Sequence, residues 1–200
     1  MKHRSAIIAA IVGVALAALV ALFAFSPKGQ DPASASASPL VGKLAPELVG
    51  TTADGQSFDL DKHRGQWVLV NFFATWCPPC VAEQPELVAL SERNAGELQI
   101  VSVAYEDTAE KVQEFFAERG GEWPALVADT GRASIDYGVI KLPESYLVDP
   151  SGKVVHKFIG GVTAADVEKL MAESSTAGST PDTSSPDTSS PDTSTTGAGS

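Results

Sequence analysis

Residues 67–80 read Trp-Val-Leu-Val-Asn-Phe-Phe-Ala-Thr-Trp-Cys-Pro-Pro-Cys, an apolar run that leads directly into two cysteines separated by two prolines. The run over residues 67–73 is typical of a strand buried on both faces. Prolines favour the first positions of a helix, where the N–H that proline lacks would be unpaired anyway. We therefore predict a strand followed at once by a helix over residues 78–94, with Cys77 and Cys80 at the start of that helix.

The two cysteines are the only ones in the chain, and they stand three positions apart. A structural disulfide framework uses more cysteines at wider spacing, so the pair is better explained by chemistry. Unpaired N–H groups and the positive end of the helix dipole favour a thiolate at Cys77, while Cys80, one turn further on, is expected to be more sheltered. This spacing lets the two sulfurs form a disulfide without backbone movement. We predict a redox-active pair, with Pro78 and Pro79 supporting the helix start.

The rest of the central region alternates between strand-like and helix-like segments. We predict strands around Ile100 and Leu126, a helix over Thr108–Arg119 before Gly120-Gly121, and then a short helix. After these we predict a hairpin of Ser145–Val148 and Val154–Ile159 around a turn at residues 149–152. The last predicted helix is capped by Thr163, with Asp166 in a capping-box position. This order indicates an α/β fold with a central mixed sheet flanked by helices on both faces.

Residues 1–26 combine a basic flank with a charge-free run from Ala6 to Phe25. At about 1.5 Å per residue such a run spans a bilayer core of about 30 Å. The basic flank favours a cytoplasmic N-terminus, so we expect a single-pass anchor that places the remaining chain outside the cytoplasm. A cleaved secretory signal is the alternative, because residues 33–37 offer small-residue cleavage sites. Both interpretations export the protein.

Composition divides the remaining chain into three parts. Residues 27–39 are small and polar and predict a flexible linker, and residues 40–173 form the predicted folded domain. Residues 174–200 repeat Pro-Asp-Thr-Ser and carry no large apolar side chain, which predicts a disordered tail. A net charge of −11 argues against nucleic-acid binding.

Residues 72–80, together with Tyr137-Gly138-Val139 and the segment 142–149, resemble the thioredoxin superfamily. Within it, the chain is similar to the membrane-anchored thiol-disulfide oxidoreductases of the TlpA, ResA and CcmG (DsbE) group, over residues 41–169. The resemblance implies a thioredoxin-like fold in which Pro143 follows a cis peptide bond and faces the cysteines. Leu142 would offer backbone hydrogen bonds to an extended substrate. The tract 106–129 is similar to the insertion of this group.

One position departs from plain thioredoxins. Their buried aspartate is replaced by Asn71, so another carboxylate has to handle protons. Glu83 and Glu144 match acidic positions of the ResA and CcmG proteins, and we predict that one or both tune the thiol pKa values. The alternative for Glu83 is an ordinary solvated helix residue. Trp76 is expected either to shield the sulfurs and offer a flat contact surface or to be a merely packed aromatic.

The resemblance favours a reductase that keeps the haem-attachment thiols of apocytochrome c reduced, with electrons from a membrane partner of the CcdA or DsbD type. Two alternatives stay open: an oxidant in disulfide formation of exported proteins, and a copper chaperone on the same fold. Chaperones of that kind resemble a wider Cys-x-x-x-Cys with a distant histidine. Because His63 and His156 are scattered, we predict no metal site, and we predict no cofactor.

Overall fold

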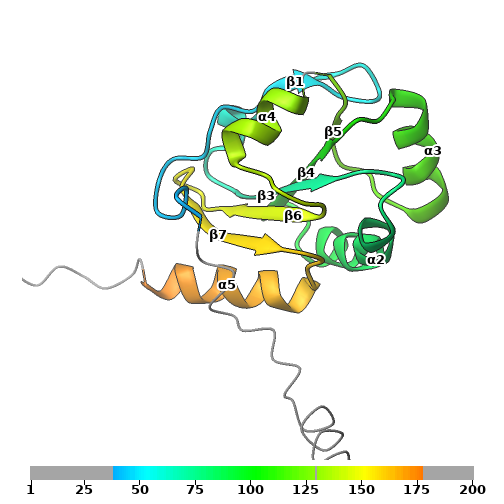
Figure 1. Ribbon diagram of the computed structural model, residues 1–200. Helices are drawn as coiled ribbons and strands as arrows, with labels where there is room; N and C mark the ends of the chain where they lie inside the picture. The colour runs from blue at the N-terminus through cyan, green and yellow to red at the C-terminus, as the bar shows by residue number, and fades with distance from the viewer. Residues whose placement is uncertain (1–37, 129, 178–200) are drawn as a thin grey trace, which may run out of the picture.

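The computed structural model describes residues 38–128 and 130–177, which form a five-stranded mixed sheet with helices on both faces (Figure 1). The elements are β1 Val49–Thr51, β2 Ser57–Asp59, the 3-10 helix η2 Leu60–His63, β3 Trp67–Phe73, α2 Pro78–Arg93, β4 Leu98–Ala104, α3 Ala109–Arg119, β5 Ala125–Leu126, α4 Thr130–Tyr137, β6 Glu144–Val148, β7 Val154–Ile159 and α5 Ala164–Ala177. The strand order is β5-β4-β3-β6-β7. β4 and β5 continue the sheet in parallel from β3, whereas β6 and β7 are antiparallel to their neighbours.

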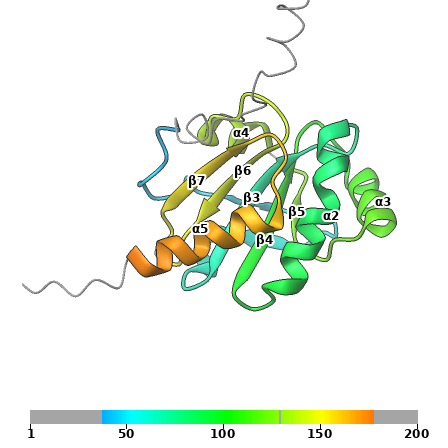
Figure 2. The ribbon, with the colours of Figure 1, turned by 90° about the horizontal axis from the view of Figure 1, so that it is seen from below.

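β3 is the central strand, and all seven of its residues are buried. Because side chains alternate along a strand, Val70 and Phe72 point to one face and Leu69 and Asn71 to the other. Val70 and Phe72 pack with Tyr137 of α4, and Leu69 packs in the layer formed by α2 and α5. Figure 2 shows α2 and α5 together on one face of the sheet, with α4 behind it. The uninterrupted apolar run is therefore explained by cover on both faces.

The predicted strands and helices of the central region are confirmed within one or two residues. Thr108 caps α3, its hydroxyl accepting the N–H of Lys111, and α3 ends at Gly120 with φ 81°. Thr163 accepts the N–H of Asp166 at the start of α5, as the capping-box pattern predicts. α3 and β5 both fall within the predicted insertion.

Two features differ from the predictions. α5 continues to Ala177, so the predicted tail is wrong for residues 174–177. There the hydroxyls of Ser175 and Thr176 bond to carbonyls one turn earlier, so these polar residues are accommodated within the helix. The β1–β2 hairpin and η2 were not predicted, because strands of three residues with mostly exposed side chains carry no apolar run.

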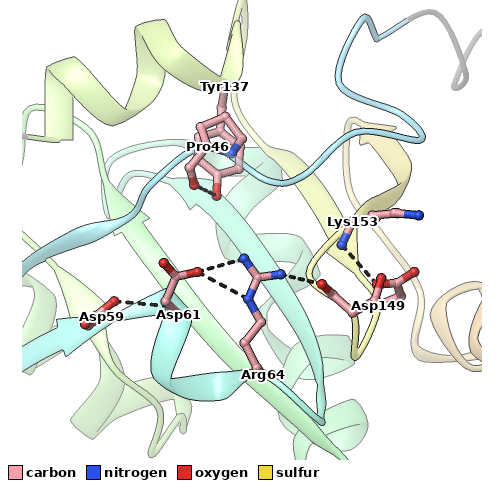
Figure 3. A network of polar contacts seen from close by, with 8 residues as sticks. Pro46, Asp59, Asp61, Arg64, Tyr137, Asp149 and Lys153 are labelled. Carbon is pink, nitrogen blue, oxygen red and sulfur yellow. Dashed lines mark hydrogen bonds and ion pairs between the residues drawn. The ribbon is translucent and has the colours of Figure 1, made fainter.

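Arg64 links η2 to the β6–β7 turn (Figure 3). Its guanidinium donates to Asp61 Oδ1 at 2.7 Å and to the carbonyl of Ser151 in the β6–β7 turn at 2.5 Å. Gly152 has φ 87°, and a Cβ there would come within 0.9 Å of Arg64 Nη1. The predicted turn is confirmed by the Gly152 N–H, which donates to the carbonyl of Asp149 at 2.8 Å. This turn therefore requires glycine both for its backbone angle and for the guanidinium above it.

Within residues 38–128 and 130–177, no helix has the length and apolar character needed to cross a membrane. The predicted anchor over residues 1–26 and the predicted linker up to residue 37 lie outside the described residues, as does the predicted tail from residue 178 onward.

Candidate active site

Cys77 and Cys80 form a disulfide at the junction of β3 and α2, with their Cα atoms 5.3 Å apart. Cys77 is the N-cap of α2, the two prolines occupy the first two helical positions, and Cys80 follows at the third. The Cys77 carbonyl accepts the N–H of Val81 at 3.0 Å, which begins the helical bonding. The predicted placement of the pair at a helix start is confirmed. Since Pro78 and Pro79 lack an N–H, Cys80 supplies the first backbone N–H of the helix.

The two cysteines differ in accessibility. Cys77 is 5% exposed and Cys80 is 1% exposed, so Cys80 is the more sheltered, as predicted, although both are buried in the disulfide. Trp76, directly before Cys77, is 57% exposed. Trp76 is therefore not a packed core aromatic. It presents an open apolar surface beside Cys77, the more exposed of the two cysteines.

Two segments border the disulfide. Thr75, two positions before Cys77, is tied to the loop after β4: its N–H donates to Asp107 Oδ2 at 2.7 Å and its hydroxyl to Oδ1 at 3.1 Å. The Leu142–Pro143 peptide bond is cis, as the family resemblance implies. Leu142 packs against the buried cluster that contains both cysteines. Its predicted backbone contact with a substrate stays a prediction.

A row of polar side chains crosses the sheet behind the cysteines. Asn71 of β3 lies in register with Ser102 of β4 on one side and with Ser145 of β6 on the other. The Asn71 amide nitrogen donates to Ser145 Oγ at 3.0 Å and to Glu83 Oε1 at 2.8 Å. The Ser102 hydroxyl donates to Asn71 Oδ1 at 3.5 Å and accepts the indole N–H of Trp123 at 2.8 Å. The neutral amide is therefore the centre of a buried polar network.

Glu83 is a buried carboxylate, not a solvated helix residue. Its Oε1 accepts from Asn71, and its Oε2 accepts the backbone N–H of Val162 at 3.0 Å. Burial raises the pKa of Glu83 to about 7, and the hydrogen bonds from Val162 and Asn71 oppose part of this rise. Glu83 lies one helical turn after Cys80, a spacing that places side chains on the same helix face. A carboxylate with this pKa can both accept and release a proton near neutral pH.

Glu144 has a different environment. Its neighbour two positions on, Tyr146, packs with α4, so Glu144 lies on the face of the sheet opposite Glu83. Glu144 Oε2 forms an ion pair with Lys157 Nζ at 2.8 Å, and both side chains are buried. Burial alone would lower the pKa of Lys157, but its contacts with Glu144 and Tyr146 outweigh burial and raise it. The predicted influence of Glu144 on the thiols stays a prediction.

The sequence alone did not single out several residues of this site. They are Ser102, Trp123, Ser145, Lys157, Val162 and Asp107. Polar residues within otherwise apolar strands, Asn71 in β3 and Ser102 in β4, were the available signal. Using it requires the strand register, which local sequence does not provide.

The disulfide at the strand-to-helix junction, the cis-proline and the sheet order define a thioredoxin-like thiol-disulfide oxidoreductase. Residues 40–172 match the Redoxin family, and the chain belongs to it.

Curated relatives carry the same class of name. The chain is 34% identical to the thiol:disulfide interchange protein HelX of Rhodobacter capsulatus, over 72% of this chain and 82% of that protein. It is 36% identical to the DsbE homolog of Paracoccus denitrificans, over 68% of this chain and 76% of that protein. A crystal structure of a thiol:disulfide interchange protein from Chlorobium tepidum superposes with a TM-score of 0.59 at 30% identity, covering 65% of this chain and 94% of that one.

Proposed function

We propose that this oxidoreductase works outside the cytoplasm, anchored through Ala6 to Phe25, and reduces disulfides in exported proteins, with apocytochrome c as its main substrate. The observation that carries the proposal is the buried Glu83 one turn behind Cys80, with a pKa of about 7. A reductase has to deprotonate its resolving thiol, and a carboxylate of this kind is suited to accept that proton. The interchange proteins HelX and DsbE among the relatives support the reaction class.

The proposed reaction begins in the reduced protein. The Cys77 thiolate attacks one sulfur of the partner disulfide, forms a mixed disulfide and releases the other partner sulfur as a thiolate. Cys80 then attacks Cys77, which closes the Cys77–Cys80 disulfide and releases the second partner thiolate. Two electrons pass from the cysteine pair to the partner. The partner thiolates take up protons from the surroundings.

We assign Glu83 as the group that accepts the proton of the Cys80 thiol. Its carboxylate takes that proton as Cys80 becomes a nucleophile, and it returns the proton when the pair is reduced again. A membrane electron donor of the CcdA or DsbD type would supply two electrons by thiol exchange with Cys77. Trp76 and the Leu142 backbone would hold the extended substrate over Cys77 of the reduced pair.

Trapping tests the proposed substrate. A full-length Cys80→Ser variant is expressed in the native cells, and the proteins bound to Cys77 by mixed disulfides are identified after purification without reductant. Apocytochromes are the expected catch, and the matched Cys77→Ser variant is expected to capture none of them.

Two results would contradict the proposal. Capture of a broad set of exported cysteine proteins, with a reduction potential above about −180 mV, would indicate an oxidant. Stoichiometric Cu(I) binding by the reduced protein, with no trapped partner, would indicate a copper chaperone.

A further inference from the structure

The polar row behind the cysteines begins in the insertion, far from the sulfurs in sequence. Trp123 lies between α3 and β5, and its side chain is buried. Its position is fixed from two sides: Gln84 of α2 donates to the carbonyl of Gly120 at 2.6 Å, and Gly121 lies against the indole. A Cβ at Gly121 would come within 3.2 Å of the Trp123 ring. The insertion is therefore packed tightly onto the helix that carries the redox pair.

The hydrogen bonds of the row run in one direction. An indole N–H can only donate, so the Ser102 oxygen accepts from Trp123 and its own proton has to point elsewhere. That proton points to Asn71 Oδ1, at 3.5 Å the longest link of the row. With the amide oxygen facing Ser102, the amide NH2 faces Glu83 and Ser145. Donors thus follow one another from Trp123 to the carboxylate, and such chains reinforce each member.

This orientation favours ionised Glu83. Both carboxylate oxygens already accept hydrogen bonds, from Asn71 and from Val162. A protonated Glu83 would need an acceptor, and Asn71 could provide one only by turning its amide over. The turned amide would direct its NH2 at Ser102, whose hydroxyl proton would then have no place in the row. As long as Trp123 donates to Ser102, turning the amide is therefore unfavourable.

We propose that Trp123 is a positioning residue for the redox site, which fixes the Asn71 amide through Ser102 so that Glu83 is held as a hydrogen-bond acceptor. The proposal rests on the proposed role of Glu83 as the partner of Cys80. It assigns the insertion a part in proton handling, although the insertion itself contributes no titratable side chain to the row.

Other titratable groups near Glu83 are left in place when the Trp123 N–H is removed. On α2 they are the two cysteines and Glu86, whose Oε2 accepts the N–H of Ala164 at 3.0 Å. Asp166 of α5 bonds to the hydroxyl of its own N-cap, Thr163. β3, β4 and β6 present Asn71 and the two serines, which do not titrate, while the Glu144–Lys157 pair lies on the other face.

The test compares Trp123→Phe with Trp67→Phe in the oxidised full chain. Phenylalanine keeps an aromatic ring against Phe116 but removes the N–H that reaches Ser102. Trp67 is the matched control because it is 5% exposed, against 7% for Trp123, and belongs to the same core cluster. The titration midpoint of Glu83 is followed by NMR of carbon-13-labelled glutamate carboxyls, with Glu83→Gln to assign the signal. We expect Trp123→Phe to raise the midpoint by about half a pH unit or more, and Trp67→Phe to leave it unchanged.

Ser102→Ala is the second variant, because it breaks the same link without altering an aromatic ring. Ser102→Ala is also expected to raise the titration midpoint of Glu83. A Glu83 midpoint that stays at its wild-type value in both variants, or that moves as far in Trp67→Phe, would overturn the proposal.

A second readout separates this proposal from the function it rests on. The rate of Cys77 alkylation by iodoacetamide is measured against pH in the reduced variants. If the Glu83 midpoint moves but the alkylation profile does not, Trp123 positions Glu83 as proposed, and the assigned role of Glu83 in thiol chemistry fails. If the midpoint does not move, the positioning role fails whatever the alkylation profile shows.

Discussion

Glu83 and Glu144 are both buried carboxylates beside the redox segments, yet their environments differ in kind. Glu83 is held by uncharged donors, the Asn71 amide and the Val162 N–H. Glu144 faces the ammonium group of Lys157 at 2.8 Å, on the other face of the sheet. A buried cation compensates the charge of its partner, whereas dipoles leave a carboxylate able to change protonation near neutral pH. The Glu144–Lys157 pair therefore suits structure, and the environment of Glu83 suits proton transfer.

The largest expected effect follows from removing the cation. Lys157→Met leaves the Glu144 charge buried without its partner, and we expect a loss of about 3–5 kcal/mol in the free energy of unfolding. Urea denaturation of the oxidised protein near neutral pH measures it. The double variant Lys157→Met/Glu144→Gln is expected to recover most of the loss, because neither charge remains. A single-variant loss under about 1 kcal/mol would show that Lys157 is not what compensates Glu144.

The next effect distinguishes the two carboxylates by pH. The pKa of Glu83 is about 7 in the folded protein against an ordinary value of 4.5, so the folded state binds a proton that the unfolded state has lost. The stability from this proton is fully present below about pH 4.5 and is lost as the pH rises through about 7. A shift of this size corresponds to roughly 3 kcal/mol.

We therefore expect wild type to lose roughly 3 kcal/mol relative to Glu83→Gln as the pH rises across this window. Urea denaturation of both oxidised proteins at a series of pH values provides the comparison. The variant Lys157→Met/Glu144→Gln is the control and is expected to keep the wild-type pH dependence. Equal pH dependence of wild type and Glu83→Gln would mean that folding does not raise the pKa of Glu83.

A smaller effect is expected at the sulfurs. In the reduced protein, a carboxylate one turn from Cys80 opposes a second negative charge, so Glu83→Gln is expected to lower the midpoint of the thiol titration by about one pH unit. Removing the Glu144–Lys157 pair changes no net charge, and we expect a shift under about 0.3 units. The pH dependence of the iodoacetamide alkylation rate measures the midpoint of the thiol titration in both variants. A larger shift in Lys157→Met/Glu144→Gln than in Glu83→Gln would mean that the Glu144–Lys157 pair, and not Glu83, tunes the thiols.

The sequence predicted the parts of the site that local patterns determine. The strand over residues 67–73, the helix that follows and the cysteines at its start all depend on neighbours within a few positions. The cis peptide before Pro143 was predicted as well, but from the family resemblance and not from the physical chemistry of the residues. Each of these features can be recognised without knowing which strands are neighbours.

What the sequence could not predict depends on strand register. Asn71, Ser102 and Ser145 are far apart in the chain, and only the pairing of β3 with β4 and β6 makes them a row. The ion pair of Glu144 likewise depends on the register of β6 and β7. Glu83 was identified as a candidate, but its burial was not predicted. α2 buries two polar residues, Glu83 and Gln84, and exposes the next two, so its sequence shows no clear apolar stripe from which burial could be inferred.

Glu86 provides the sharpest test of whether burial is what distinguishes Glu83. Its Oε2 accepts the Ala164 N–H at 3.0 Å, the same kind of contact that Glu83 makes with Val162 one turn earlier, but Glu86 is exposed. Water can replace an exposed carboxylate, so we expect Glu86→Gln to cost under about 1 kcal/mol in urea denaturation and to leave the thiol titration unchanged. A thiol shift in Glu86→Gln as large as in Glu83→Gln would mean that the charge of α2 as a whole acts on the sulfurs. The buried contact with Asn71 would then have no special part in the chemistry.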